Sequence, residues 1–224
     1  MSTRMHKPKS RRLPANLLRA WHGIPAAVAA DVLGGRGHAD PAIRPLRPFA
    51  TPPRLVGSAI TAWCTPADYG PVHHAIAVAE AGDVIVVAAG GRSDAAMIGE
   101  LLSGAARRKG IAGVVVDGAV RDVGTLASWP DFFVFSRWVT PRGPSAMEHG
   151  SVNDTVVFGG ISVTPFDIVI GDDDGLVFVP HALAREALKP CQARLAAEAG
   201  WEAELAKGRS TIDVFAVPAA ARDS

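Results

Sequence analysis

The sequence predicts an α/β fold: a single compact domain with a partly parallel central sheet and a β-rich second half. The length of 224 residues suits one domain. With 48% hydrophobic and 20% charged residues, the chain has the composition of a packed globular protein. Between residues 83 and 135, short apolar runs alternate with segments of helical spacing, which is the pattern of parallel strands joined by crossover helices.

The first part of the chain is basic. Residues 1–30 contain no Asp or Glu, and we expect residues 1–23 to form a flexible, solvated lead; a transit peptide and a polyanion-binding arm are the alternatives. A short helix is predicted over residues 25–33, because glycines follow it directly. Residues 39–53 are rich in proline and are expected to form an extended loop, before a strand at 54–61.

The alternating part of the sequence follows. Apolar runs such as DVIVVAA, before Gly90, lack the polar alternation of a half-exposed strand and are therefore predicted to be buried on both faces. Glycines close the intervening helices. The predicted elements are a helix at 73–81, a strand at 83–89, a helix opening near 100 and ending at Gly110, a strand at 113–117, a helix at 119–129 and a strand at 132–135.

Short strands and turns characterise the second half. We expect strands at 155–158, 161–163, 167–170 and 176–179. Helices are then predicted from His181 to about Lys207, with an interruption near Pro190, because proline lacks the helical N–H. The domain is assigned to residues 24–210 and a C-terminal tail to 211–224.

The composition disfavours several classes of protein. Cys64 and Cys191 are too few for a disulfide framework and lie in no CxxC motif, so a cytoplasmic setting is expected. No apolar run approaches the roughly 18 residues that a membrane span needs. The net charge of +1 gives no general attraction to nucleic acid or acidic membranes. We therefore expect neither nucleic acid nor a membrane as a partner.

Candidate site residues follow two buried strands, at the strand ends where ligands usually bind in open α/β sheets. A helix opening at residue 99 offers free N–H groups that suit a carboxylate. An arginine after the next strand suits an anion, and the aspartate beside it suits a hard divalent cation. The candidates are Gly99, Glu100, Leu101, Leu102, Arg121 and Asp122.

The same residues have plainer interpretations. Glu100 at a helix start complements the helix dipole, and Arg121 with Asp122 suits an exposed ion pair worth under about 1 kcal/mol. His73 and His74 are adjacent, so they share no helix face and are interpreted as part of a helix start, not as metal ligands. Residues 172–175 (DDDG) lack the spacing of a calcium loop and are interpreted as a turn.

Taken in order, the motifs of this chain resemble the signature of the RraA-like family, whose members include 4-hydroxy-4-methyl-2-oxoglutarate aldolases and 4-carboxy-4-hydroxy-2-oxoadipate aldolases of class II. The matching stretches are Gly82-Asp83-Val84, Gly99-Glu100-Leu101-Leu102, Gly110, Gly113, Asp117-Gly118, Arg121-Asp122-Val123 and Asp172-Asp173-Asp174-Gly175. The resemblance covers about residues 24–210. It implies a swivelling-type domain, sandwich-like with α/β/α layers, assembled as a homotrimer or as a homohexamer of two trimers.

The resemblance also implies roles for the candidate residues. The backbone of residues 99–102 would bind the substrate carboxylate, Arg121 would bind the substrate, and Asp122 would be the only direct protein ligand of Mg2+ or Mn2+. Glu100 stands where some aldolases carry aspartate, so it keeps the charge on a longer arm. Phe166 and Trp138 stand where the family usually has glycine, and both are expected to reshape a turn or the mouth of the pocket.

The chemistry of a 2-oxo acid fits these residues. Cleavage of the carbon–carbon bond beside the oxo group leaves an enolate, which a lysine Schiff base or a metal with cationic groups must stabilise. No lysine lies in a predicted buried strand, where a lowered pKa would be expected, so the metal route is favoured. At an effective dielectric constant near 20, one charge pair at about 4 Å is worth ~4 kcal/mol before desolvation.

These observations predict a metal-dependent lyase that cleaves or decarboxylates short 2-oxo-di- or tricarboxylic acids, such as 4-hydroxy-4-methyl-2-oxoglutarate and oxaloacetate, to give pyruvate. Arg121, Asp122 and Glu100 are the predicted catalytic residues. The alternative is a non-catalytic regulator that binds an RNA-degrading enzyme, because family members with that role resemble this chain and can keep the Arg-Asp pair.

Overall fold

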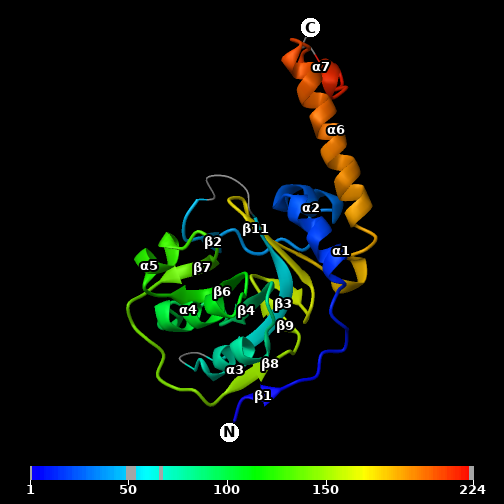
Figure 1. Ribbon diagram of the computed structural model, residues 1–224. Coiled ribbons are helices and arrows are strands. Elements are labelled where there is room, and N and C mark those ends of the chain that lie inside the picture. The colour runs from blue at the N-terminus through cyan, green and yellow to red at the C-terminus, as the bar shows by residue number, and fades with distance from the viewer. Residues whose placement is uncertain (1, 49–53, 66–67, 222–224) are drawn as a thin grey trace.

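The structure, a computed structural model, describes residues 2–48, 54–65 and 68–221. Residues 49–53 of the loop expected at 39–53 lie outside the described residues. So do residue 1 of the lead and residues 222–224 of the tail. The predicted α/β class and the partly parallel sheet in one domain are confirmed (Figure 1). Within the described ranges, no helix is both long and apolar enough to cross a membrane.

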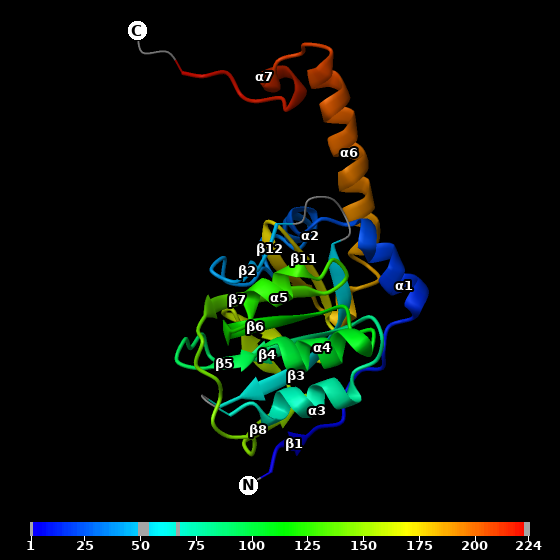
Figure 2. The ribbon, with the colours of Figure 1, turned by 60° about the vertical axis from the view of Figure 1, so that its left-hand side comes forward.

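A ten-stranded mixed sheet forms the centre of the domain (Figure 2). Its strands are β1 (Arg4–Met5), β2 (Arg44–Pro45), β3 (Leu55–Cys64), β4 (Asp83–Ala88), β5 (Ala96–Ile98), β6 (Gly113–Val120), β7 (Phe133–Val139), β8 (Gly150–Val152), β11 (Ile168–Asp172) and β12 (Gly175–Val179). The main path runs β1-β8-β3-β4-β6-β7-β2. The pairs β3–β4, β4–β6 and β6–β7 are parallel, as the alternation of apolar runs and helices predicts.

The other elements pack around this sheet. The hairpin β9 (Val156–Phe158) and β10 (Ile161–Val163) forms a second, two-stranded sheet. The helices are α1 (Ala15–Ala20), α2 (Ala26–Val32), α3 (Gly70–Val78), α4 (Glu100–Arg108), α5 (Val123–Ser128), α6 (Leu188–Ala206) and α7 (Thr211–Val214), with 3-10 turns η1 (Trp21–Gly23) and η2 (His181–Leu183).

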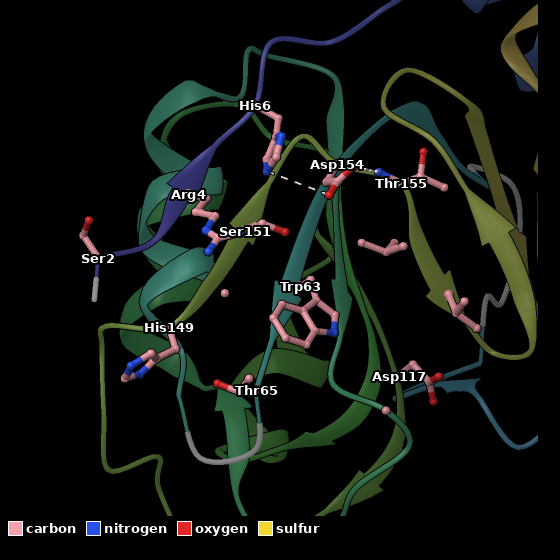
Figure 3. A pocket seen from close by; sticks show the side chains of 14 residues that line it. Ser2, Arg4, His6, Trp63, Thr65, Asp117, His149, Ser151, Asp154 and Thr155 are labelled. Carbon is pink, nitrogen blue, oxygen red and sulfur yellow. Dashed lines mark hydrogen bonds and ion pairs between the residues drawn. The ribbon is translucent and has the colours of Figure 1, made fainter.

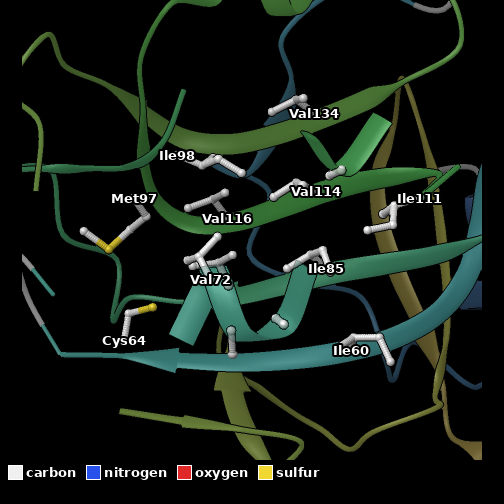
Figure 4. Packing of buried hydrophobic residues seen from close by; sticks show 14 of the residues in the cluster. Ile60, Cys64, Val72, Ile85, Met97, Ile98, Ile111, Val114, Val116 and Val134 are labelled. Atoms are coloured by element: carbon white, nitrogen blue, oxygen red, sulfur yellow. The ribbon is translucent and has the colours of Figure 1, made fainter. Parts of the chain in front are cut away.

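The strand period of two divides the core between the two faces of the sheet. On β3, Ile60 and Cys64 face the cluster under α3, α4 and α5, where Val72 packs over the strands (Figure 4). Leu55 and Ala59 face the opposite cluster, which Val156 and other side chains of β9 cover. Helices α3–α5 and the hairpin β9–β10 therefore lie on opposite faces of β3. A third cluster joins α2 and α6 to β11 and β12.

The predicted helix at 119–129 is wrong over its first residues. Ala119 pairs with both Ala96 of β5 and Trp138 of β7, so the chain continues as strand to Val120. The helix that follows, α5, is confined to Val123–Ser128. Sheet pairing on both sides outweighs the helical tendency of these residues. As a result, Arg121 and Asp122 form the turn between a strand and a helix.

The predicted interruption of the last helix near Pro190 is also wrong. Pro190 is the third residue of α6, which continues unbroken to Ala206. A proline in the first turn removes an N–H that has no partner within the helix, so it costs little there.

The end of the lead packs against the domain, although the whole lead was predicted to be flexible and solvated; residues 2–16 are exposed or partly exposed. Trp21 is fully buried, and its Nε1 donates to the carbonyl oxygen of Ala184 at 3.0 Å. Arg12 forms an ion pair with buried Asp83 and lies 4.9 Å above the ring of Phe166. Burial of apolar surface and of a paired carboxylate thus hold this segment to the core.

The chain ends in a helical arm. Helix α6 projects from the body of the domain in both views, with its first turns packed against α2 (Figures 1 and 2). The predicted tail begins with α7, which folds back so that the rings of Phe215 and Trp201 lie 5.3 Å apart.

The packing of Trp21 predicts how its loss would change the free energy of unfolding. Replacing Trp21 by alanine leaves a cavity and an unpaired carbonyl, and we expect the free energy of unfolding to fall by about 3–5 kcal/mol. Guanidinium unfolding followed by circular dichroism measures it. Arg19→Gln on exposed α1 is the control and should change stability by no more than about 0.5 kcal/mol. An equally small effect of Trp21→Ala would contradict the packed lead.

Candidate functional site

The six candidate residues come together at two adjoining turns. The amide of Arg121, just past the end of β6, donates to the carbonyl oxygen of Ile98 at 3.1 Å, which sets the two turns side by side. Asp122 then adopts a left-handed backbone conformation (φ 58°) as the residue before α5. Aspartate is one of the few residues that tolerate this conformation.

The carboxylate of Asp122 lies at the N-terminus of α4. Its Oδ2 accepts a hydrogen bond from the amide of Glu100 at 2.9 Å. Gly99 makes this approach possible, because a Cβ there would overlap both the Asp122 carboxylate and the Arg121 side chain. Residue 99 must therefore be glycine, because any Cβ would occupy the space that the Asp122 carboxylate takes.

Arg121 lies beside this carboxylate. Its Nε is 3.7 Å from Asp122 Oδ2, and the two side chains are 42% and 41% exposed. A Cβ on Gly143 would overlap the guanidinium, so the loop at residue 143 also approaches it closely. The pair is open to a ligand, unlike a salt bridge sealed in a core.

A cavity of about 160 Å3 opens next to the guanidinium. Gly99 and the first turn of α4, through Leu101 and Leu102, contribute to its wall. The other lining residues are Tyr69, His73, Ala96, Met97, Ile98, Arg121 and Pro144. Apart from Arg121, the wall is mostly apolar, which would strengthen the attraction between this cation and an anion.

Sequence reasoning missed the three residues of this wall that come from distant segments: Tyr69, His73 and Pro144. They come from α3 and its preceding turn and from a loop more than twenty residues after Arg121, and no spacing rule links such segments. The rings of Tyr69 and His73 lie 4.9 Å apart. Partial burial, with the neighbouring His74, lowers the pKa of His73, so it is neutral at pH 7 and Arg121 supplies the positive charge.

The side chain of Glu100 lies on the outer side of the same turn. Its Oε2 accepts a hydrogen bond from Thr125 Oγ1 of α5 at 3.3 Å. The two aromatic departures lie elsewhere: Phe166 packs under Arg12, and Trp138 donates to the carbonyl oxygen of Gly91. Neither lines the cavity beside Arg121, so the expected effect on its mouth is not seen.

The Asp122 carboxylate suits a hard divalent cation that keeps water in most of its coordination positions. Among the described residues, no group of three or more His, Cys, Asp or Glu side chains could hold a metal ion together. Asp122 offers a carboxylate that is held in place at Oδ2 and two-fifths exposed. One carboxylate with water in the remaining positions is a frequent arrangement for Mg2+, whereas structural zinc needs four ligands.

Comparison with known proteins identifies related sequences and structures. Residues 26–178 match the RraA-like family, described as Aldolase/RraA. The chain is 31% identical over 181 residues to the "Putative 4-hydroxy-4-methyl-2-oxoglutarate aldolase" of Halalkalibacterium halodurans, which covers 81% of this chain and 84% of that protein.

Solved structures share the fold. A protein of Pseudomonas syringae pv. tomato aligns with a TM-score of 0.78 and 26% identity, over 92% of this chain and all of that one. Streptomyces coelicolor RraAS2, described as an unusual member of the RNase ES inhibitor RraA protein family, aligns with a TM-score of 0.76 and 25% identity, over 86% of this chain and all of that one. The chain therefore belongs to the RraA-like family.

Proposed function

We propose that this protein is a divalent-metal-dependent lyase that cleaves or decarboxylates short 2-oxo-di- or tricarboxylic acids, such as 4-hydroxy-4-methyl-2-oxoglutarate and oxaloacetate, and releases pyruvate. The observation that carries the proposal is the position of the Asp122 carboxylate, bonded to the amide of Glu100 and adjacent to Arg121. The name of the 31% identical relative supports the retro-aldol reaction.

The N-terminus of α4 would bind the carboxylate beside the oxo group. The amide of Glu100 is already used by Asp122, and the amide of Ser103 donates to Gly99, at 3.1 Å. The amides of Leu101 and Leu102 make no hydrogen bond with a described residue and point out of the first turn. Two free N–H groups at the positive end of a helix suit a carboxylate.

Arg121 and Asp122 would stabilise the negative charge that appears on the oxo oxygen. In the retro-aldol reaction the bond between C3 and C4 breaks, the C4 hydroxyl loses its proton, and the electron pair moves onto the oxo oxygen of the pyruvate half. A Mg2+ or Mn2+ ion held by Asp122 would act as a Lewis acid at that oxygen. Arg121 adds a fixed positive charge at the same place.

Glu100 is the residue assigned to the proton steps. Its carboxylate is exposed beside the turn, within reach of Thr125 Oγ1. A carboxylate in this position can take the proton of the C4 hydroxyl and return a proton to C3 of the pyruvate half. In oxaloacetate CO2 leaves without a hydroxyl proton, so decarboxylation should depend less on Glu100 than retro-aldol cleavage does.

The oligomeric state belongs to the same proposal. The family resemblance implies a homotrimer or a homohexamer, and α6 supplies a projecting surface through which copies could associate (Figure 1). Sedimentation equilibrium of the full chain tests this directly.

The rival function is a non-catalytic regulator of an RNA-degrading enzyme. The description of Streptomyces coelicolor RraAS2 favours it, because that protein belongs to an RNase inhibitor family and shares this fold. Turnover distinguishes the two functions, since a regulator needs neither a metal nor a bound 2-oxo acid.

The first test is metal-dependent turnover. We expect pyruvate release from both acids with Mg2+ or Mn2+, its loss in EDTA, and its recovery on adding the metal. Arg121→Ala and Asp122→Ala should each lower kcat/KM by about 100-fold or more, because each removes charge stabilisation in the transition state.

The matched control uses a different exposed ion pair, which Arg107 of α4 forms with Asp131. Arg107 and Asp131 are paired at 2.7 Å with side chains 35% and 61% exposed. Their alanine variants should keep turnover near that of the parent. Absence of turnover on every 2-oxo acid tried, with the metal present, would favour the regulator.

The second test concerns the space at residue 99. Gly99→Ala places a methyl group against the Asp122 carboxylate, so we expect a loss of kcat/KM comparable to that of Asp122→Ala. Gly124→Ala is the control on α5, since a Cβ there meets nothing within 4 Å, and it should be active and at least as stable. Full activity in Gly99→Ala would contradict the proposed geometry.

A further inference from the structure

A second cavity, of about 910 Å3, lies on the opposite face of the sheet from α3–α5 (Figure 3). It shares no lining residue with the cavity beside Arg121. Its floor is formed by β1, β8 and β3, and one wall by residues 154–157 at the start of the β9–β10 hairpin. The volume is within the range of sites for small organic ligands.

Strand register sets three side chains in one row across this floor. Arg4 is paired with Ser151 between β1 and β8, and Ser151 is paired with Trp63 between β8 and β3. Paired residues project from the same face of a sheet. His6, His149 and Thr65, which directly flank the ends of these three strands, also line the cavity.

Trp63 gives the floor a flat apolar surface. It is 46% exposed, whereas every other residue of β3 is buried. Val157, 68% exposed, contributes a second apolar side chain to the lining. An accessible indole ring favours stacking with another flat ring.

Arg4 gives the cavity an uncompensated positive charge. Within residues 2–48, 54–65 and 68–221, its guanidinium has no hydrogen-bond or ion-pair partner. Figure 3 shows it beside Ser151, on the same side of the cavity as the indole. A cation and an exposed aromatic ring that line the same cavity, two strands apart, suit an anionic group attached to a ring.

The acidic side chains of the cavity already have partners. Asp117 accepts from Arg137 Nε at 2.7 Å and from the amide of Gly159 at 2.8 Å. Asp154 accepts from the amide of Thr155 and lies 3.8 Å from His6 Nε2.

His149 is likewise engaged, because its Nδ1 lies 3.1 Å from the buried carboxylate of Asp68. Among the described lining residues, Arg4 is therefore the permanent cation that is available to pair with a ligand. A single carboxylate matches this one guanidinium.

We infer that this cavity is a second ligand site, which binds an aromatic carboxylate with its ring on Trp63 and its carboxylate on Arg4. The match to the RraA-like family begins at residue 26, so the strand of the floor that carries Arg4 belongs to the N-terminal lead, outside that match. The lead thereby acquires a role in recognition as well as in packing. The inference does not depend on the proposed lyase activity.

Calorimetric titration with 2-naphthoate tests the site. The parent should bind the acid saturably, and 2-naphthamide, its neutral analogue, at least tenfold more weakly. Arg4→Gln and Trp63→Leu should each raise the Kd of the acid tenfold or more. Arg19→Gln, which removes a charge from the exposed surface of the same lead, and Arg121→Ala should leave the Kd unchanged.

Three outcomes would overturn the inference. They are no saturable binding of the acid at millimolar concentration, equal binding of acid and amide, and binding that is lost in Arg121→Ala but kept in Trp63→Leu. Arg4 is exposed, so Arg4→Gln reports on binding even if Trp63→Leu fails to fold. Circular dichroism of each variant verifies that the fold is intact.

Discussion

The hydrogen bond from the Glu100 amide to the Asp122 carboxylate is the interaction on which the candidate site depends. It joins the turn after β6 to the start of α4, through two residues that lie 22 positions apart along the chain. It also requires a glycine at residue 99 and a left-handed backbone at residue 122. Without it, the carboxylate would lose its fixed position relative to the free N–H groups of α4 and to Arg121.

This bond in turn depends on the sheet. β5 and β6 are paired in parallel, and the amide of Arg121 continues that pairing by bonding Ile98. The two turns therefore leave the sheet at the same edge and in a fixed register. A rigid scaffold of this kind suits a site whose polar groups must be oriented before the ligand arrives.

Both cavities lie toward the carboxyl ends of the central parallel strands, but on opposite faces. Cys64 points into the core under α3, and its neighbour Trp63 points into the larger cavity. In the same way, Val116 packs under the helices while Asp117 faces the larger cavity. Because side chains alternate along a strand, consecutive residues face the apolar core under the helices and the larger cavity on the other face. The N-terminal lead forms part of the larger cavity only.

The sequence by itself determined the alternation of the main strands and helices along the chain, but not the short strands β5 and β8. Uninterrupted apolar runs such as residues 83–88 identified the buried parallel strands, and glycines such as Gly110 marked the ends of helices, because these signals depend only on local backbone preference and burial. The six candidate residues were also found, since they follow strand ends in a recognisable family pattern. Their meeting at one place is confirmed by the structure, while their roles stay predictions.

The features that depend on contacts between residues far apart in the sequence were decided only by the tertiary structure. Ala119 and Val120 are strand because β5 and β7 lie on either side of them. Trp21 is buried in a cluster that includes Ala184, more than 160 residues away, whose carbonyl oxygen accepts its N–H. Tyr69, His73 and Pro144 reach the site from distant segments, and Arg4 is aligned with Trp63 across two strand pairings. No local pattern records such contacts, because their free energy exists only once the sheet has formed.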